Sequence, residues 1–194
     1  MEKPLEENKK IIIDYKKNKI ELVDKGMTTK VLSGVYIGEN GLTNDKREGD
    51  KCTPIGLFNL GFAFGTLEQK FTYPYYKINE NQYWVDDPSS PFYNEWVEVT
   101  KETKDFPYKY MNTSKEVTWN SAEHLIDYPI QYQLAFVIEY NINPKESNHG
   151  SAIFFHVKNN ETTAGCVATT LENLLYIINW LGNSKAKILI KFWI

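Results

Sequence analysis

The 194 residues predict a mainly β protein in a single domain, with one substantial helix. Aromatic residues make up 14% of the chain, including 13 Tyr, and they favour strands. Several short runs are rich in β-branched and aromatic side chains and are separated by turn residues. Only residues 170–181 repeat apolar side chains at the spacing of an amphipathic helix. A chain of this length can bury a full core without metals or disulfides.

The N-terminal part of the sequence predicts strands joined by polar loops. Residues 1–10 are strongly charged and are expected to form a disordered or tag-like lead before the domain at 11–194. A polar loop is predicted over 41–56, and residues 66–120 lack helical periodicity. Strands are predicted at 11–15, 19–23, 31–37, 57–60, 84–85 and 96–99, the first two forming a hairpin.

The C-terminal part carries the clearest periodic patterns. Residues 121–127 predict one or two helical turns, with Ser121 as N-cap and Pro129 beyond the end. The run 151–157 is continuously apolar, which is typical of a buried central strand, and strands are also predicted at 132–140 and 186–193. The helix at 170–181 is predicted from the following residues: apolar Leu171, Leu174, Leu175, Ile178 and Leu181, the capping pair Thr169 and Glu172, and the terminator Gly182.

Composition and charge exclude several functional classes. The net charge of −3 gives no general nucleic-acid footprint. The two cysteines, Cys52 and Cys166, form neither a C-x-x-C motif nor a zinc quartet, and nothing predicts a metal or an organic cofactor. The charged start of the chain predicts neither a signal peptide nor a membrane span. Arg47 is the one arginine among 22 basic residues. A single arginine in a chain that otherwise uses lysine suggests a use for its planar, bidentate side chain.

Cys166 and His156 are the candidate nucleophile and base. His156 ends an apolar run, and Cys166 follows ten positions later between Gly165 and small residues. A nearby imidazole is the usual means of forming a thiolate near neutral pH. The backbone N–H groups of 164–166 are candidates for an oxyanion hole, and the following helix is expected to place its positive end near the thiol.

Spacing alone leaves a structural interpretation open. A lone cysteine is often a buried small hydrophobe, and a histidine at a strand end is often a hydrogen-bonded core residue. In that case the chain would be a binding module with an inert thiol. A reactive Cys166 is expected to be alkylated well below pH 8, and an inert one to react as slowly as free cysteine.

Five sequence blocks together resemble the L,D-transpeptidase catalytic domain (YkuD-like) family. They resemble a branch whose nucleophile motif reads TAGC in place of the more frequent SHGC, and the resemblance covers roughly residues 45–191. The blocks are KREGD at 46–50, TPIGLF at 53–58, WVDDPSS at 84–90 with Tyr93 and Asn94 after it, GSAIFFH at 150–156 and TAGCVA at 163–168.

The resemblance implies a β-sandwich-like fold with a helix beside the catalytic loop, and an enzyme of the bacterial cell wall. Cys166 would attack the carbonyl before the D-alanine of a peptidoglycan stem peptide and form a thioester. The amine of a second stem peptide would then give a 3→3 cross-link. His156 would act as base and the backbone of Ala164, Gly165 and Cys166 as oxyanion hole. The resemblance also implies an envelope location and a carbapenem adduct on Cys166.

Two positions depart from the commoner family motif. Ala164 and Ala168 stand where a histidine and an arginine are frequent, so Arg47 or His124 is a candidate substitute. The alternative is a salt bridge for Arg47 with Glu48 or Asp50, and a structural hydrogen bond for His124. Trp84, Tyr93 and Thr163 are the other candidates for contact with substrate, with a structural role as the alternative for the two aromatic residues.

The sequence leaves the acceptor and the role of the second thiol open. Water in place of an amine would make the protein an L,D-carboxypeptidase or endopeptidase, because acceptor choice depends on the shape of the groove. A wall-binding module without catalysis and a cytosolic thiol hydrolase are further alternatives. Cys52 is either incidental or able to inactivate Cys166 through a disulfide.

Overall fold

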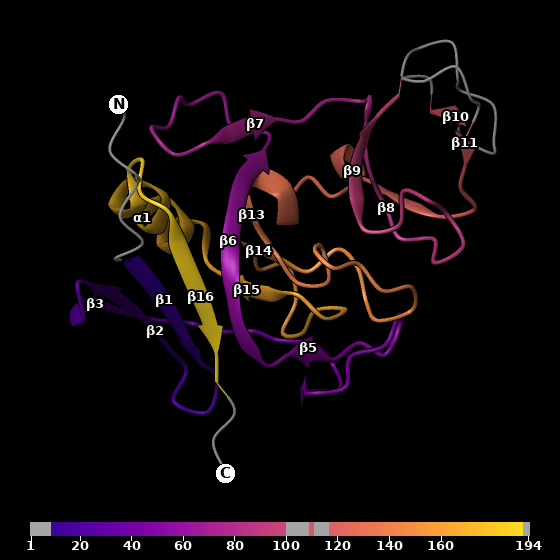
Figure 1. Ribbon diagram of the computed structural model, residues 1–194. Coiled ribbons are helices and arrows are strands. Elements are labelled where there is room, and N and C mark those ends of the chain that lie inside the picture. Colours follow the sequence, from indigo (N-terminus) through magenta and orange to yellow (C-terminus); the bar gives the residue numbers. More distant parts are fainter. Residues whose placement is uncertain (1–8, 100–108, 111–116, 192–194) are drawn as a thin grey trace, which may run out of the picture.

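The computed structural model describes residues 9–99, 109–110 and 117–191 (Figure 1). Its main feature is a curled nine-stranded sheet in the order β15-β14-β13-β6-β16-β1-β2-β3, with β7 paired to β6. The strands are β1 (Lys9–Asp14), β2 (Lys19–Asp24), β3 (Met27–Ser33), β6 (Gly56–Gly65), β7 (Tyr75–Lys77), β13 (Ala135–Ile138), β14 (Phe154–Val157), β15 (Val167–Thr169) and β16 (Ala186–Ile190).

The predicted mainly β fold with one substantial helix is confirmed. Smaller elements complete the described structure. A three-stranded sheet has the order β12-β8-β9, and two further strand pairs are β4–β5 and β10–β11. These elements are β4 (Leu42–Thr43), β5 (Thr53–Pro54), β8 (Gln82–Val85), β9 (Glu95–Glu98), β10 (Lys109–Tyr110), β11 (Val117–Thr118), β12 (Ala122–His124), the 3-10 helices η2 (Leu125–Asp127) and η3 (Gln131–Gln133), and the helix α1 (Leu171–Leu181).

The two faces of the main sheet pack into different hydrophobic clusters. Alternate residues of a strand face opposite sides of a sheet. Phe155 and Val157 of β14 belong to the larger cluster, which also contains the buried residues of α1. Phe154, which precedes Phe155 and therefore faces the opposite side, belongs to a second cluster together with Cys166. The second cluster therefore lies on the side of the sheet that carries the candidate nucleophile.

Helix α1 forms for the reasons that the sequence predicted, with one change at its start. Its buried side is the apolar stripe, and Gly182 ends it at φ +58°. The N-cap is Thr170, whose hydroxyl accepts a hydrogen bond from Asn173 N. The neighbouring hydroxyl of Thr169 donates instead to Gly34 O at 2.6 Å, so it joins the helix start to the loop after β3.

Several sequence predictions differ from the structure. Of the strand predicted at 132–140, only 135–138 are a strand, and Tyr132 and Gln133 lie in η3. Residues 122–124 form a strand and not a helical turn, because their backbone pairs with β8, and only 125–127 are helical. Lys9 and Lys10 start β1 instead of belonging to a disordered lead, because they pair in parallel with β16; residues 1–8 of that lead lie outside the described residues. The strand predicted at 31–37 is β3, which ends at Ser33.

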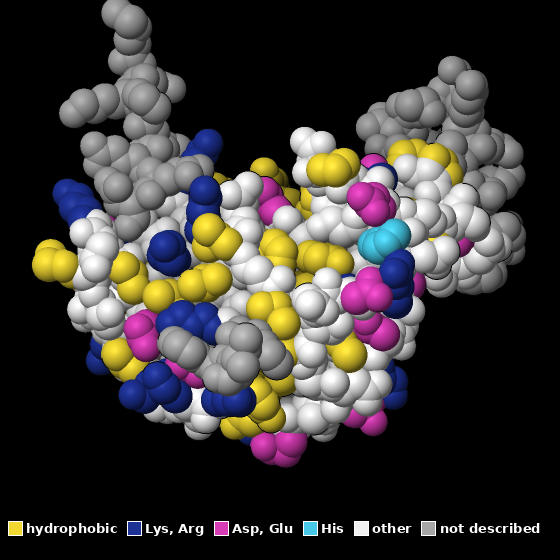
Figure 2. Space-filling model, turned by 60° about the horizontal axis from the view of Figure 1, so that its bottom comes forward, with side chains coloured by type: hydrophobic (Ala, Val, Ile, Leu, Met, Phe, Trp, Pro, Cys, Tyr) yellow, Lys and Arg dark blue, Asp and Glu magenta, His cyan; other side chains and the backbone are white. Residues whose placement is uncertain are grey.

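Charged side chains are distributed unevenly over the surface. Lysines gather on the side of the molecule that carries β1–β3, whereas acidic side chains concentrate on the opposite side (Figure 2). The lysines include Lys9, Lys10, Lys25 and Lys187, which line one shallow hollow. Within the described residues, no helix is both long enough and apolar enough to cross a membrane.

Candidate active site

The parallel pairing of β14 and β15 brings Cys166 and His156 to the same side of the sheet. His156 is paired with Ala168. Cys166 precedes β15 and stands two residues before Ala168, so its side chain is on the same face as that of His156. The sequence predicted a nucleophile and a base on neighbouring backbone segments, and the structure places both residues on the wall of one cavity.

The cavity has a volume of about 300 Å³, and most of the residues that line it have polar side chains. Of the residues that the structure describes, no group of three or more His, Cys, Asp or Glu side chains is arranged to hold a metal ion. The residues that line the cavity are Glu39, Lys51, Glu123, Tyr128, Gln131, Tyr132, His156, Asn159, Asn160, Thr162, Thr163, Ala164, Cys166 and Ala168.

The thiol of Cys166 is held by backbone groups in a protonated state. Phe154 N donates to Sγ at 3.3 Å, and Sγ donates to Ala152 O at 3.2 Å. Burial, with the nearby charge of Glu123, raises the pKa of Cys166 to about 12. The resting thiol is therefore not ionised near neutral pH. The expectation of a thiol that ionises well below pH 8 does not fit this environment.

The imidazole of His156 is neutral and oriented by the backbone. Its Nδ1 lies 2.8 Å from Val157 O, which fixes the proton on Nδ1 and leaves Nε2 with a free electron pair. Burial lowers the pKa of His156 to about 4. The ring of Tyr132 packs edge-on against it, with 6.0 Å between ring centroids. A neutral imidazole in this position can accept a proton from a thiol.

The helix dipole does not act on Cys166 in the predicted way. Strand β15 separates Cys166 from the N-cap of α1, which is Thr170. Three strand residues span about 10 Å, whereas the effect of a helix terminus falls off within about one turn. The prediction that the helix places its positive end near the thiol is therefore wrong, because the intervening residues are extended.

The nucleophile loop offers two free backbone donors in place of the predicted three. Gly165 N donates to Thr163 Oγ1 at 3.1 Å, and the same hydroxyl donates to Cys166 O at 2.7 Å. Thr163 therefore holds the loop closed. Within the part of the chain that the structure describes, the N–H groups of Ala164 and Cys166 have no protein acceptor, so these two remain available for an oxyanion.

Gly165 is required by both its conformation and its surroundings. Its φ is +139°, and a Cβ added there would lie 3.0 Å from Cys52 O. A side chain at this position would be strained and would press on the neighbouring loop. The close approach shows that the nucleophile loop packs directly on the segment around Cys52.

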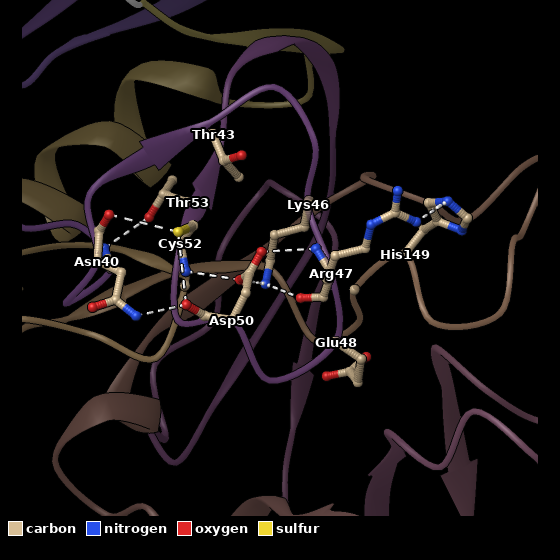
Figure 3. A network of polar contacts seen from close by, with 12 residues as sticks. Asn40, Thr43, Lys46, Arg47, Glu48, Asp50, Cys52, Thr53 and His149 are labelled. Atoms are coloured by element: carbon tan, nitrogen blue, oxygen red, sulfur yellow. Dashed lines mark hydrogen bonds and ion pairs between the residues drawn. The ribbon is translucent and has the colours of Figure 1, made fainter.

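Residues 40–53, the supporting loop, contain a polar network (Figure 3), and this segment contacts the nucleophile loop. Thr53 Oγ1 donates to Cys166 O at 3.0 Å. The ammonium of Lys46, which is only 5% exposed, donates to Asp50 at 2.5 Å. Burial alone would raise the pKa of Asp50, but hydrogen bonds from Lys46 and from the N–H groups of Arg47 and Cys52 lower it.

Arg47 and His124 do not line the cavity. Arg47 is largely exposed and pairs with Asp45 at 2.8 Å, while its other nitrogen lies 2.7 Å from Nε2 of His149 (Figure 3). Its salt bridge is thus with Asp45, and not with the predicted Glu48 or Asp50. The ring of His124 stacks on Tyr83 at 4.4 Å between centroids.

Trp84 and Tyr93 are core residues in this structure. Each is 2% exposed. The indole of Trp84 donates to Asn94 Oδ1 at 3.0 Å, and the hydroxyl of Tyr93 donates to Glu48. The two aromatic residues thus stabilise the buried core and do not line the cavity.

The two cysteines are both free thiols. The thiol of Cys52 points to the backbone oxygens of Asn40 and Asp50, each at 3.6 Å. It lies in the supporting loop and does not line the cavity with Cys166.

Glu123 and Tyr132 are cavity residues that the sequence analysis missed. The hydroxyl of Tyr132 donates to the carboxyl of Glu123. Burial is the main cause that raises the pKa of Glu123 to about 7 and the pKa of Tyr132 well above its usual value. In a strand, neighbouring side chains point to opposite faces, so Glu123 faces the cavity while His124 turns away. A strand assignment for 122–124 would have provided this signal.

Two solved structures of longer proteins are similar to this chain. The helical cell shape determining protein Pgp2 from Campylobacter jejuni is similar at 14% identity with a TM-score of 0.48, over 94% of this chain and 47% of Pgp2. An L,D-transpeptidase from Mycobacterium smegmatis is similar at 9% identity with a TM-score of 0.43, over 95% of this chain and 59% of that protein. The chain thus spans about half the length of these proteins.

No curated protein matches the sequence. A family model matches residues 8–190, a range that includes every strand of the main sheet, the nucleophile loop and the supporting loop. The chain therefore belongs to the family of the L,D-transpeptidase catalytic domain (YkuD).

Proposed function

We propose that the protein is a cysteine acyl-transfer enzyme, an L,D-transpeptidase that forms 3→3 cross-links between peptidoglycan stem peptides in the cell envelope. Cys166 is the nucleophile and His156 the base. The main support is that a thiol and a neutral imidazole lie on one face of two adjacent strands and line one cavity. Membership of the L,D-transpeptidase family supports the substrate class.

In this mechanism, proton transfer accompanies attack on the substrate. The raised pKa of Cys166 and the lowered pKa of His156 disfavour a thiolate–imidazolium pair in the free protein. When the carbonyl before D-alanine enters the cavity, Nε2 of His156 takes the thiol proton as sulfur bonds to carbon. The N–H groups of Ala164 and Cys166 stabilise the oxyanion. D-alanine leaves with the proton from His156, and a thioester remains.

Incubation with a tetrapeptide stem tests this function directly. Mass spectrometry of the wild-type protein should show release of D-alanine, a thioester adduct and a cross-linked product. Cys166→Ala should abolish all three while circular dichroism shows an intact fold, and Cys52→Ser should leave them unchanged. His156→Gln should lower the rate of thioester formation by about a hundredfold or more. Turnover by the Cys166→Ala variant would contradict the proposal.

The same incubation separates an amine acceptor from water. Release of D-alanine without a cross-linked product, at high concentrations of acceptor peptide, would assign the protein as an L,D-carboxypeptidase. A carbapenem should acylate Cys166 and add its mass to the chain. That adduct should be absent from Cys166→Ala.

A further inference from the structure

We propose that Glu123, held by Tyr132, binds the acceptor amine and so directs the thioester toward an amine instead of water. This inference rests on the proposed function, because it concerns the second half of the same reaction. The ligand class is a primary amine carried by the incoming peptide, which is a cation in solution near neutral pH.

The strand pairing places Glu123 beside the reacting groups. Glu123 in β12 is paired directly with Trp84 in β8. The indole of Trp84 packs edge-on against Phe154, with 5.0 Å between ring centroids, and Phe154 N is the group that donates to the thiol of Cys166. Glu123 and Cys166 both line the cavity, and the charge of Glu123 acts on the thiol of Cys166.

Tyr132 connects Glu123 to the base. Its hydroxyl donates to one carboxyl oxygen of Glu123, while its ring packs against His156. An ionised carboxylate accepts about four hydrogen bonds through its two oxygens. Of the groups that the structure describes, the Tyr132 hydroxyl is the one side-chain donor to this carboxyl, so acceptor capacity remains for a ligand.

The charges around the cavity favour a cation at Glu123. Glu39 and Lys51 also line the cavity, but they form a salt bridge with each other at 2.8 Å and are more than half exposed. Over the described ranges 9–99 and 117–191, no lysine or arginine pairs with Glu123. Asp86 and Glu48 add further negative charge nearby. A partly buried carboxylate without a cationic partner is unfavourable, and a bound ammonium relieves this.

The chemistry of the second half-reaction needs such a group. The acceptor ammonium must lose a proton before its nitrogen can attack the thioester. The pKa of Glu123, raised to about 7, makes it a stronger base than an ordinary exposed carboxyl. The titratable groups that interact with it include Tyr128, Tyr132, Asp86, Glu48 and the thiol of Cys166.

The acceptor nitrogen loses two protons as it attacks the thioester. The ammonium first gives one proton to the Glu123 carboxylate, and the resulting amine attacks the thioester carbonyl carbon. A C–N bond forms and the C–S bond breaks, so that sulfur leaves with its electron pair. The second proton of the nitrogen passes through His156 to sulfur and restores the thiol. Glu123 then releases its proton to solvent, and no oxidant or further reactant is needed.

The test is the partition of one thioester between competing acceptors. The donor is a tetrapeptide stem with its own amines acetylated, so that only the acceptor can contact Glu123 as an amine. The acceptors are a primary alkyl amine, which is cationic near neutral pH, and hydroxylamine, which is uncharged there, with water present throughout. Mass spectrometry gives the ratio of alkyl amide to hydroxamate and of alkyl amide to free acid.

Glu123→Gln should lower both ratios by about tenfold to a hundredfold, as expected for the loss of one charge-assisted hydrogen bond. Glu39→Gln is the matched control, since this carboxylate lines the same cavity but already has a partner, and its ratios should equal those of the wild type. Because the products derive from one thioester, a change in the rate of acylation does not alter the ratios.

Equal ratios for the wild type and Glu123→Gln would overturn the inference. This outcome is also expected if Glu123 has only a structural role, because its loss would then slow all the reactions alike. If Glu123→Gln does not fold, Glu123→Asp keeps the charge but withdraws it by one methylene. An unchanged ratio in that folded variant would equally overturn the inference. Failure of the wild type to form any thioester is a separate result, seen as a missing mass adduct, and would refute the proposed function itself.

Discussion

At the scale of single residues, burial keeps both proposed reacting groups uncharged. Cys166 is 9% exposed and His156 is 7% exposed, and desolvation disfavours the charged form of each. The pKa of the thiol therefore rises while the pKa of the imidazole falls. In many reactive cysteines a cationic neighbour stabilises the thiolate. Here the arrangement instead favours proton transfer at the moment of attack.

Alkylation of Cys166 should therefore be slow and should accelerate with pH. In a Cys52→Ser background, the rate with iodoacetamide at pH near 8 should be about tenfold or more below that of free cysteine, because the raised pKa leaves little thiolate. The rate should continue to increase beyond about pH 10 without a plateau. Timed mass measurements across this range test the prediction. A plateau below about pH 8 would show that the thiolate is stabilised after all.

At the scale of elements, local patterns predicted the strands and the helix better than the site. Runs rich in β-branched residues identified β1 and β2, and the apolar stripe with Gly182 identified α1. The placement of Cys166 beside His156 depends on the parallel pairing of β14 with β15, which is tertiary structure, so spacing could only suggest it. Glu123 was missed because Ala122–His124 has no strong strand pattern of its own and becomes a strand only through pairing with β8.

The loop at 40–53 contains two consecutive cationic residues, Lys46 and Arg47, for which we expect different roles. Lys46 is buried and paired with Asp50 under the nucleophile loop, whereas Arg47 is about half exposed. Lys46→Met removes the cationic partner of Asp50, which keeps its two hydrogen bonds from backbone N–H groups, and should lower the free energy of unfolding by about 1–3 kcal/mol. Arg47→Ala should change it by less than about 1 kcal/mol. Urea unfolding of both variants measures the difference.

Steady-state kinetics of the same two variants tests their part in the reaction. Lys46→Met should also lower kcat, because the supporting loop contacts Gly165 and the carbonyl of Cys166. Arg47→Ala should leave kcat and KM close to the wild-type values. A marked increase of KM in Arg47→Ala alone would instead support the sequence-based prediction that this arginine contacts substrate.

At the scale of the whole molecule, the site lies on the smaller of the two hydrophobic clusters that contain residues of the main sheet. The cluster around Phe154 and Cys166 lies on one side of the curled sheet, while α1 packs in the larger cluster on the other side. Titratable groups such as His156 and Glu123 are therefore placed against a hydrophobic interior. Because their protonation differs between the folded and unfolded chain, the stability of the entire fold depends on pH.

Acid should destabilise the fold through His156. The folded chain binds a proton at this ring only near pH 4, whereas the unfolded chain does so near 6.5. Below about pH 6.5 the unfolded state thus binds more protons, and the free energy of unfolding falls as pH falls. The complete difference corresponds to about 3 kcal/mol. Between about pH 7 and pH 4.5, His156→Gln should consequently lose about 2 kcal/mol less stability than the wild type.

Glu123 should act in the opposite direction over the same range. Its pKa is raised in the folded state, so the folded chain takes up this proton first and gains stability as pH falls from about 7. Glu123→Gln should therefore lose more stability on acidification than the wild type, while His156→Gln loses less. Urea unfolding at a series of pH values measures both slopes against the wild type, which corrects for the carboxylates common to all three proteins. If the free energy of unfolding depends on pH in the same way in all three proteins, neither His156 nor Glu123 is desolvated in the folded protein. The neutral Cys166 and His156 proposed for the mechanism would then lose their physical basis.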